Sequence, residues 1–290
     1  MLLLIRIFSL LPLSVLYCLA DGVIYPLVRY VVRYRLKVVR KNIRLSFPEK
    51  SEKEQNAIIN AFYHHFADLL VEIIYGYRMS DEEMRERFVF ENISLVEELA
   101  QKNKGVFFML GHFGNWEWVA DIGKRYSDPR IKEYNVYRRL KNPSADKAML
   151  ALRHKRGGGG CIEKGQLLRQ LVAMRHTSEL ITIGLISDQK PSPRNAHVWT
   201  DFLNQDTAFL DGGEVLARKF GYAVTYVHIT SPKRGYYRAC FELITDDPAS
   251  TAPDEITLRY AQLLESNIRL QPELWLWSHN RWKYNRESCK

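Results

Sequence analysis

The sequence predicts an α/β fold in which a mostly parallel central sheet is flanked by helices. Two apolar runs, Val106 to Leu110 and Leu180 to Ile186, have the composition of short strands that are buried on both faces. Segments with helical periodicity lie between and around these runs, which is typical of α/β proteins. The 290 residues are 46% hydrophobic and 26% charged, enough to build a substantial core, and no linker rich in Pro, Gly or Ser divides the chain. We therefore expect a single domain over residues 29–290, preceded by a distinct segment, residues 1–28.

Residues 1–28 are mostly apolar, and we interpret them as a retained membrane anchor. The uncharged run from Ile7 to Ala20 is the most apolar part, and a span of about 20 residues requires either that Asp21 is tolerated or that the N-terminal leucines are included. A secretory signal peptide is the competing interpretation, but no small-x-small cleavage site follows the run cleanly.

A basic cluster from Arg29 to Arg44 follows this apolar segment and contains no acidic residue. Nearly all of the net charge of +9 lies in the first 50 residues, whereas a nucleic-acid-binding protein usually spreads basic residues over a folded face. Positive residues beside an apolar segment stay on the cytoplasmic side and attract anionic lipid. The charge pattern thus predicts a membrane partner, no nucleic-acid partner, and a cytoplasmic domain.

Helix-start signals occur twice before the first buried strand. Ser51 and Glu54 have the spacing of a capping box, and apolar residues then recur every three or four positions as far as Tyr77. Ser94 and Glu97 have the same spacing and predict a second, shorter helix.

Further strands and helices are expected along the rest of the chain. The residue patterns predict strands at 134–137, 224–229 and 237–243, and helices at 143–154, 212–220 and 253–270. Gly157 to Gly160 lacks the end of a nucleotide-binding loop, so we interpret it as a flexible break between two helices. The tryptophans of residues 272–284 either pack in the core or form a lipid-contacting edge.

We expect no structural metal and no disulfide framework. The four cysteines are far apart and form no Cys-x-x-Cys pair. The adjacent His64 and His65 would point about 100° apart on a helix and could not easily share a metal ion. Cys161 has no neighbour in sequence that would activate it as a nucleophile.

The candidate catalytic residues directly follow the first buried strand. Gly111 and Gly114 break the strand, so His112 is expected in a strand-to-helix turn. Within a continuous helix, His112 and Glu117 would lie about 140° apart and could not meet, but a turn removes that obstacle. We expect Glu117 to accept a hydrogen bond from one ring nitrogen and to leave the other free as a general base. The alternative is a structural histidine beside an exposed glutamate.

Other polar residues follow strands that would end at the same sheet edge. Arg138 comes after the strand at 134–137, and Asp188 and Gln189 come after the strand at 180–186. The carboxyl ends of parallel strands are where such sheets place their chemistry. We therefore expect Arg138 and Asp188 to line one cleft with His112.

The segment His112-Phe-Gly-Asn-Trp-Glu117 resembles the His-x4-Glu/Asp motif of glycerolipid acyltransferases, and the wider pattern resembles their bacterial branch, the lipid A biosynthesis acyltransferases. Supporting matches follow in the same order, namely Val136-Tyr-Arg138, Asn142-Pro143, Asp188-Gln189, Leu216-Ala-Arg218 and the stretch from Pro272 to Lys283. Asn280 replaces an arginine of the usual tail, and the residues between His112 and Glu117 differ from those of the lauroyl enzymes. These departures concern the identity of the acceptor.

The resemblance implies a glycerolipid-acyltransferase-like fold at the bacterial inner membrane. It also implies transfer of a fatty acyl chain from acyl carrier protein to a hydroxyl of an anionic glycolipid, without a further cofactor. His112 and Glu117 would be the catalytic pair, and Arg138, Asn115, Asp188 and Gln189 would contact substrates. An acyl thioester is already activated, so a base and oxyanion donors are sufficient and no covalent nucleophile is required. This agrees with the lack of a Gly-x-Ser-x-Gly motif in the sequence.

Three alternatives remain at this point. The acceptor could be another lipid, such as an aminolipid or phospholipid. The same two residues could activate water in a lipid hydrolase. Finally, the chain could be a membrane-surface scaffold in which the His112 segment is structural.

Overall fold

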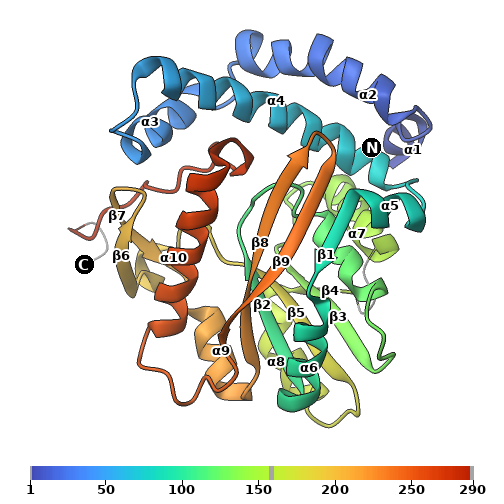
Figure 1. Cartoon of the computed structure of the whole chain (residues 1–290), viewed down its shortest axis with the longest axis vertical. Coiled ribbons are helices and arrows are strands. Elements are labelled where there is room, and N and C mark those ends of the chain that lie inside the picture. Colours follow the sequence, from blue (N-terminus) through green and yellow to red (C-terminus); the bar gives the residue numbers. More distant parts are fainter. Residues whose placement is uncertain (1, 157–159, 288–290) are drawn as a thin grey trace.

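The computed structural model describes residues 2–156 and 160–287 and confirms the predicted fold class (Figure 1). Seven strands form one sheet in the order β1-β9-β8-β2-β5-β3-β4. The strands of this sheet are β1 (Phe88–Glu91), β2 (Gly105–Leu110), β3 (Ile131–Tyr137), β4 (Gly160–Glu163), β5 (Leu180–Ile186), β8 (Ala223–Lys233) and β9 (Tyr236–Thr245). Neighbouring strands are parallel except for the pair β8 and β9, which is antiparallel.

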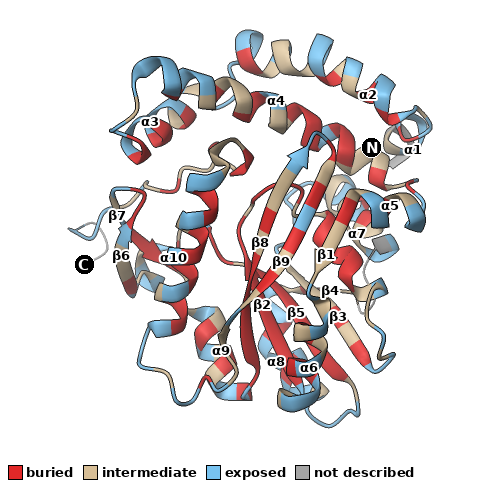
Figure 2. Ribbon diagram, in the orientation of Figure 1, coloured by how far each residue is buried: buried red, intermediate tan, exposed pale blue. Residues whose placement is uncertain are grey.

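The two predicted buried strands, β2 and β5, lie next to each other at the centre of the sheet. All six residues of β2 are buried, so both faces of the sheet are covered here (Figure 2). Met109 and Leu185 lie beside Gly213 of α9 (Gly212–Phe220). Successive strand residues point to opposite faces, and Phe108 and Ile186 accordingly face away from α9. Because β2, β5 and β3 are parallel, their carboxyl ends meet at one edge.

Helices cover the sheet and its carboxyl edge. The first capping box is present: the Ser51 hydroxyl accepts from the Glu54 backbone N–H, and the Glu54 carboxylate accepts from that of Ser51. It begins α4 (Glu52–Gly76), which lies across the end of the sheet (Figure 1). The other α-helices after the N-terminal segment are α3 (Leu36–Ser46), α5 (Asp81–Arg87), α6 (Ile93–Asn103), α7 (Pro143–Arg156), α8 (Leu167–Met174), α9 and α10 (Glu255–Leu270). A 3₁₀ helix, η3 (Trp118–Lys124), follows the turn after β2.

The second predicted helix forms as α6, but its predicted capping box is wrong. Helix α6 begins at Ile93, before Ser94, and its N-cap Asn92 is in the left-handed conformation with φ 47°. Asn92 bonds the backbone of Phe241 in β9, while Glu97 accepts hydrogen bonds from Ser127. These tertiary contacts override the local sequence signal.

Several elements were not predicted from the sequence. The short strands β1 and β4 lie at the two edges of the sheet, and β6 (Val198–Phe202) pairs with β7 (Gln205–Phe209) in a separate antiparallel ribbon. Gly157 to Gly159 lie outside the described residues, and Gly160 begins β4, so a strand and not a helix is the next element. The tail tryptophans Trp275 and Trp277 are buried, which confirms core packing for these two residues.

The N-terminal segment packs against α4 along one side. It contains α1 (Leu2–Phe8), α2 (Leu13–Leu19) and two π-helical stretches, Ala20–Ile24 and Leu27–Val31. Leu13, Leu16 and Ala20 form a small core with Ala67 and Val71 of α4.

Other apolar side chains of this segment are exposed, including those of Leu10, Val23 and Val31. Figure 2 shows several exposed stretches along this segment. Among the described residues, the helices Leu13–Val31 and Glu52–Gly76 are long and apolar enough to cross a membrane by length and composition. Within the apolar 18-residue stretch of each helix, 17% and 44% respectively is buried inside the fold. The carboxylate of Asp21 is neutralised within this apolar segment, because it forms an ion pair with Arg234 at 2.7 Å.

Candidate active site

The turn after β2 places His112 at the carboxyl edge of the sheet. Gly114 adopts φ 56°, a conformation that side-chain-bearing residues rarely adopt. A Cβ atom at Gly111 would lie 2.7 Å from Leu264 and 3.3 Å from an Asp188 oxygen, so only glycine allows this close approach. The C-terminal tail runs beside the turn, where the Leu276 backbone N–H donates to the His112 carbonyl. Two glycines and the tail therefore determine where the imidazole lies.

Asp188 holds the His112 ring. Its Oδ1 lies 2.6 Å from His112 Nδ1, and its Oδ2 accepts hydrogen bonds of 2.8 Å from the His112 backbone N–H and from the Trp275 indole. With Nδ1–H donating to Asp188, Nε2 is the nitrogen available as a base. Nε2 is 3.4 Å from the side-chain nitrogen of Gln189. Asp188 therefore lies beside His112 as predicted, and the shared cleft stays a prediction.

The predicted hydrogen bond between His112 and Glu117 is not formed. Glu117 instead accepts two hydrogen bonds from Arg153 of α7, at 2.8 Å and 2.7 Å, and one from the Trp116 indole at 3.2 Å. A bidentate pair of this kind fixes both side chains. The structure therefore assigns the ring contact to Asp188 and places Glu117 in a second, neighbouring ion pair.

The environment favours the cationic form of His112. Burial of the ring opposes that form, but the charge of Asp188 and its hydrogen bond outweigh burial, with a further contribution from Glu117, so the pKa of His112 is raised above 6.5. Burial alone would raise the pKa of Asp188, yet its contacts with His112 lower it. The pair thus stabilises an imidazolium, the species that a general base becomes.

Asn115 is part of the turn after β2. Its side chain is fully buried, and its Nδ2 donates to Glu72 of α4 at 2.9 Å; the same carboxylate accepts from the hydroxyls of Tyr17 and Tyr237. This network connects the turn to α4 and α2. The burial favours a structural role for Asn115, and its contact with substrate stays a prediction.

Arg138 and Gln189 differ in how they relate to His112. Gln189 is exposed and lies beside the free ring nitrogen. Arg138 directly follows β3, so its backbone lies at the predicted edge of the sheet. Its side chain is exposed and lines neither the apolar opening beside Glu117 nor the opening beside the C-terminal tail. A substrate contact by Arg138 stays a prediction.

An apolar opening adjoins Glu117. It contains about 390 Å³ of empty space, part of it open to solvent, and lies on the sheet face opposite α9. Phe108, Leu110, Val136 and Ile186 of the three central strands line it, with Glu117 and Arg153 among its polar members. Such a lining suits a hydrocarbon group whose reactive end is polar.

Cys161 lies near this opening but is not an activated nucleophile. Burial raises the pKa of its thiol to about 11, although Arg153 has the opposite effect. Among residues 2–156 and 160–287, no group of three or more His, Cys, Asp or Glu side chains is placed to hold a metal ion.

Arg153 and Trp275 belong to the site and were not predicted as site residues. Arg153 lies in a helix whose contact with η3 is tertiary, so no local pattern marks it. Trp275 belongs to the tryptophan-rich tail, but the sequence pattern did not indicate which of these tryptophans would reach the site. In the structure the Trp275 indole donates a hydrogen bond to Asp188.

Comparisons with known proteins identify a family and several relatives of this chain. The sequence model of a family described as "Bacterial lipid A biosynthesis acyltransferase" matches residues 1–284. The Lipid A biosynthesis palmitoleoyltransferase of Escherichia coli (strain K12) is 24% identical over 286 residues, covering 94% of this chain and 86% of the relative. The Lipid A biosynthesis lauroyltransferase of the same organism is 24% identical over 289 residues, with 94% and 87% covered. A Lipid A biosynthesis acyltransferase of Haemophilus influenzae is 21% identical over 251 residues, with 86% and 78% covered.

Proposed function

Because the chain belongs to the bacterial lipid A biosynthesis acyltransferase family and is an acyltransferase, we propose that it transfers a fatty acyl chain from acyl carrier protein to a hydroxyl of a lipid A precursor or related glycolipid. The observation that carries the proposal is the His112 ring, held through Nδ1 by Asp188 with Nε2 directed toward Gln189. This is the arrangement of a base and the group that orients it.

The reaction uses His112 as a base and then as an acid. His112 Nε2 takes the proton of the acceptor hydroxyl while its oxygen attacks the thioester carbonyl carbon. The resulting tetrahedral intermediate collapses with cleavage of the carbon–sulfur bond, and the imidazolium returns the proton to the departing thiolate. Asp188 stabilises the imidazolium throughout, which is the origin of its contribution to rate.

Glu117 acts in this scheme through its charge and through the position of Arg153. Its carboxylate favours the cationic form of His112, although more weakly than Asp188 does. Glu117 and Arg153 also line the apolar opening, where we place the acyl chain. The amide of Gln189 is positioned to contact the acceptor hydroxyl or the developing oxyanion, and Arg138 is assigned to the anionic part of a substrate.

We place the protein on the cytoplasmic side of the bacterial inner membrane. The exposed apolar side chains of residues 7–34 adjoin exposed basic residues such as Arg33, Lys37 and Arg40, a combination that favours binding to anionic lipid. Deleting residues 1–28 is expected to loosen membrane attachment without abolishing it, because the basic surface remains. Fractionation at low salt tests this, and recovery of the full-length protein in the soluble fraction would contradict it.

The decisive experiment is an acyl-transfer assay. Purified protein is supplied with acyl-acyl carrier protein and a lipid A precursor, and mass spectrometry identifies the products. An acylated glycolipid is expected, formed in proportion to released carrier protein. Free fatty acid formed without an acceptor would indicate a hydrolase instead. Full function of the His112→Ala protein in cells would indicate a scaffold.

A further inference from the structure

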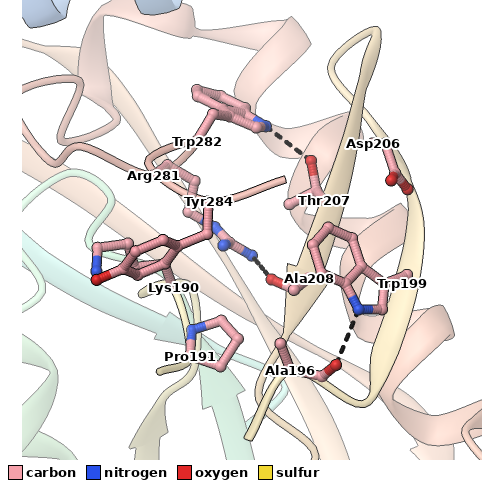
Figure 3. Close-up of a pocket in the computed structure, with 10 residues that line it drawn as sticks. All are labelled: Lys190, Pro191, Ala196, Trp199, Asp206, Thr207, Ala208, Arg281, Trp282 and Tyr284. Atoms are coloured by element: carbon pink, nitrogen blue, oxygen red, sulfur yellow. Dashed lines mark hydrogen bonds between the residues drawn. The ribbon is translucent and has the colours of Figure 1, made fainter. Parts of the chain in front are cut away.

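A second opening lies between the β6–β7 ribbon and the C-terminal tail (Figure 3). We call it the tail pocket; it contains about 260 Å³ of empty space, part of it open to solvent. Lys190 lines it from the loop after β5, Trp199 and Asp206 from the ribbon, and Arg281 from the tail. Since Lys190 is two residues after Asp188, the pocket adjoins the candidate active site without including His112.

Two cations line the tail pocket, and one of them is buried. Arg281 is 3% exposed; within residues 2–156 and 160–287 its Nη2 donates to the Ala208 carbonyl, while its Nε is buried without a hydrogen-bond partner. A buried guanidinium with unused donors is costly unless an anion or acceptor reaches it. Burial lowers the pKa of Arg281 to about 10, although the charge of Asp188 acts in the opposite direction, so Arg281 remains a cation at neutral pH. Lys190 provides a second cation, 4.4 Å from the centre of the Tyr284 ring.

The remaining lining residues suit a sugar. Trp199 and Tyr284 are half-buried and offer ring surfaces, against which the apolar face of a sugar ring can pack (Figure 3). The charge of Asp206 is already compensated by Arg286, at 2.8 Å and 3.1 Å, so its oxygens can accept from hydroxyl or amino groups without repelling an anion strongly. Two cations beside aromatic rings and a paired carboxylate are thus complementary to a phosphorylated sugar.

We propose that the tail pocket binds the phosphate-bearing sugar headgroup of the acceptor lipid. This inference rests on the proposed acyl transfer and adds a place for the acceptor: its headgroup lies between ribbon and tail, and the loop from Asp188 to Lys190 connects it with the base. A phosphate also occurs in the phosphopantetheine arm of acyl carrier protein. The aromatic lining favours the sugar phosphate, and the kinetic test separates the two sources.

The test compares Lys190→Gln with Arg194→Gln. Both changes remove one positive charge from the same loop, but Arg194 is exposed and does not line the pocket. Lys190 is preferred to Arg281 for the test because the loss of a buried arginine could prevent folding. Acyl transfer is measured with a phosphorylated acceptor and with the same lipid after enzymatic removal of its phosphates.

Lys190→Gln is expected to raise KM for the phosphorylated acceptor about tenfold, the size of one charge-assisted contact. KM for the dephosphorylated acceptor and for acyl-acyl carrier protein should stay unchanged, and Arg194→Gln should behave as the wild type. A rise in KM for the acyl donor would assign the pocket to the phosphopantetheine arm and overturn the inference. Equal effects on both acceptors, or equal behaviour of the two variants, would also overturn it.

A binding measurement separates this inference from the proposed function. Glucosamine 1-phosphate is titrated into the full-length protein, and tryptophan fluorescence reports binding because Trp199 and Trp282 line the pocket. The probe should bind the wild type more tightly than Lys190→Gln, whereas glucosamine should bind neither well. Selective binding together with no acyl transfer would refute the proposed function alone. Acyl transfer with equal binding of the probe by both proteins would refute the inference alone.

Discussion

Asp188 and Glu117 are two acidic residues near the His112 ring, and they differ in what compensates their charge. Asp188 accepts from the imidazole, from the His112 backbone N–H and from the Trp275 indole. Glu117 is held by the guanidinium of Arg153. A carboxylate already paired with arginine has less effect on a second cation than one whose charged partner is the histidine itself. The carboxylate that contacts the His112 ring is the one that the parallel strands bring close in space, not the one that is close in sequence. Asp188 is 76 residues from His112, whereas Glu117 is five residues away.

The largest expected effect comes from removing the base that Asp188 serves. His112→Ala should lower the rate of acyl transfer by 10²- to 10⁴-fold, the usual contribution of a positioned general base. Acyl-donor binding should change little, because the ring ends at the sheet edge and does not line the apolar opening. Single-turnover transfer rates and a separate donor-binding measurement test this. An active variant would remove the basis for comparing the two carboxylates at all.

Asp188→Asn should cause the next largest loss, on the order of 10²-fold or more, because the amide cannot stabilise the imidazolium. Combined with His112→Ala, it should cost little beyond the histidine change alone, since the two residues act as one unit. Rates of the single and double variants, measured on folded protein, provide the test. Additive losses of rate would show that Asp188 contributes to catalysis independently of the His112 ring.

Much of this arrangement could be predicted from the sequence, and the limits have physical causes. Val106 to Leu110 and Leu180 to Ile186 are apolar enough to identify as buried strands, and parallel strands bring the residues after them to one edge. That rule correctly placed Asp188 with His112. It could not choose between two nearby carboxylates, because the choice depends on Arg153, and α7 approaches η3 only in the folded chain.

The missed elements have similar causes. The strands β6 and β7 contain polar and charged residues among apolar ones, since they form a ribbon outside the main sheet. The helix predicted after Ser94 forms as α6, but its predicted capping box does not, because Asn92 bonds β9 and Glu97 bonds Ser127. In both cases tertiary contacts, which local patterns do not record, decide the outcome.

Glu117→Gln should reduce the transfer rate by roughly tenfold, less than Asp188→Asn, because its charge favours the imidazolium more weakly. It should also destabilise the fold, since it leaves Arg153 half-buried without its anion. The double variant Glu117→Gln/Arg153→Gln should recover part of that stability. Thermal unfolding of the wild type, the two single variants Glu117→Gln and Arg153→Gln, and the double variant would measure this recovery. A loss of rate larger than that of Asp188→Asn would reverse the ranking of the two acids.

The smallest expected effect is a shift in pH dependence, and it compares the acids directly. The base must be neutral and its pKa is raised above 6.5, so kcat/KM should rise with pH through an apparent pKa above that value. Asp188→Asn removes the largest effect that raises the pKa of His112 against burial, so the rise in kcat/KM should move to lower pH. Glu117→Gln should move the rise in kcat/KM in the same direction by a smaller amount.

The stability of the His112–Asp188 pair has a corresponding sign. A pKa raised in the folded state stabilises the protein fully below pH 6.5, and this stabilisation is lost as pH rises through the folded pKa; the lowered pKa of Asp188 limits it on the acid side. The difference in Tm between wild type and Asp188→Asn should therefore be greatest in mildly acidic solution and decrease as His112 deprotonates. If Glu117→Gln shows this pattern instead, Glu117 is the carboxylate coupled to the ring, and the roles assigned to the two acids are exchanged.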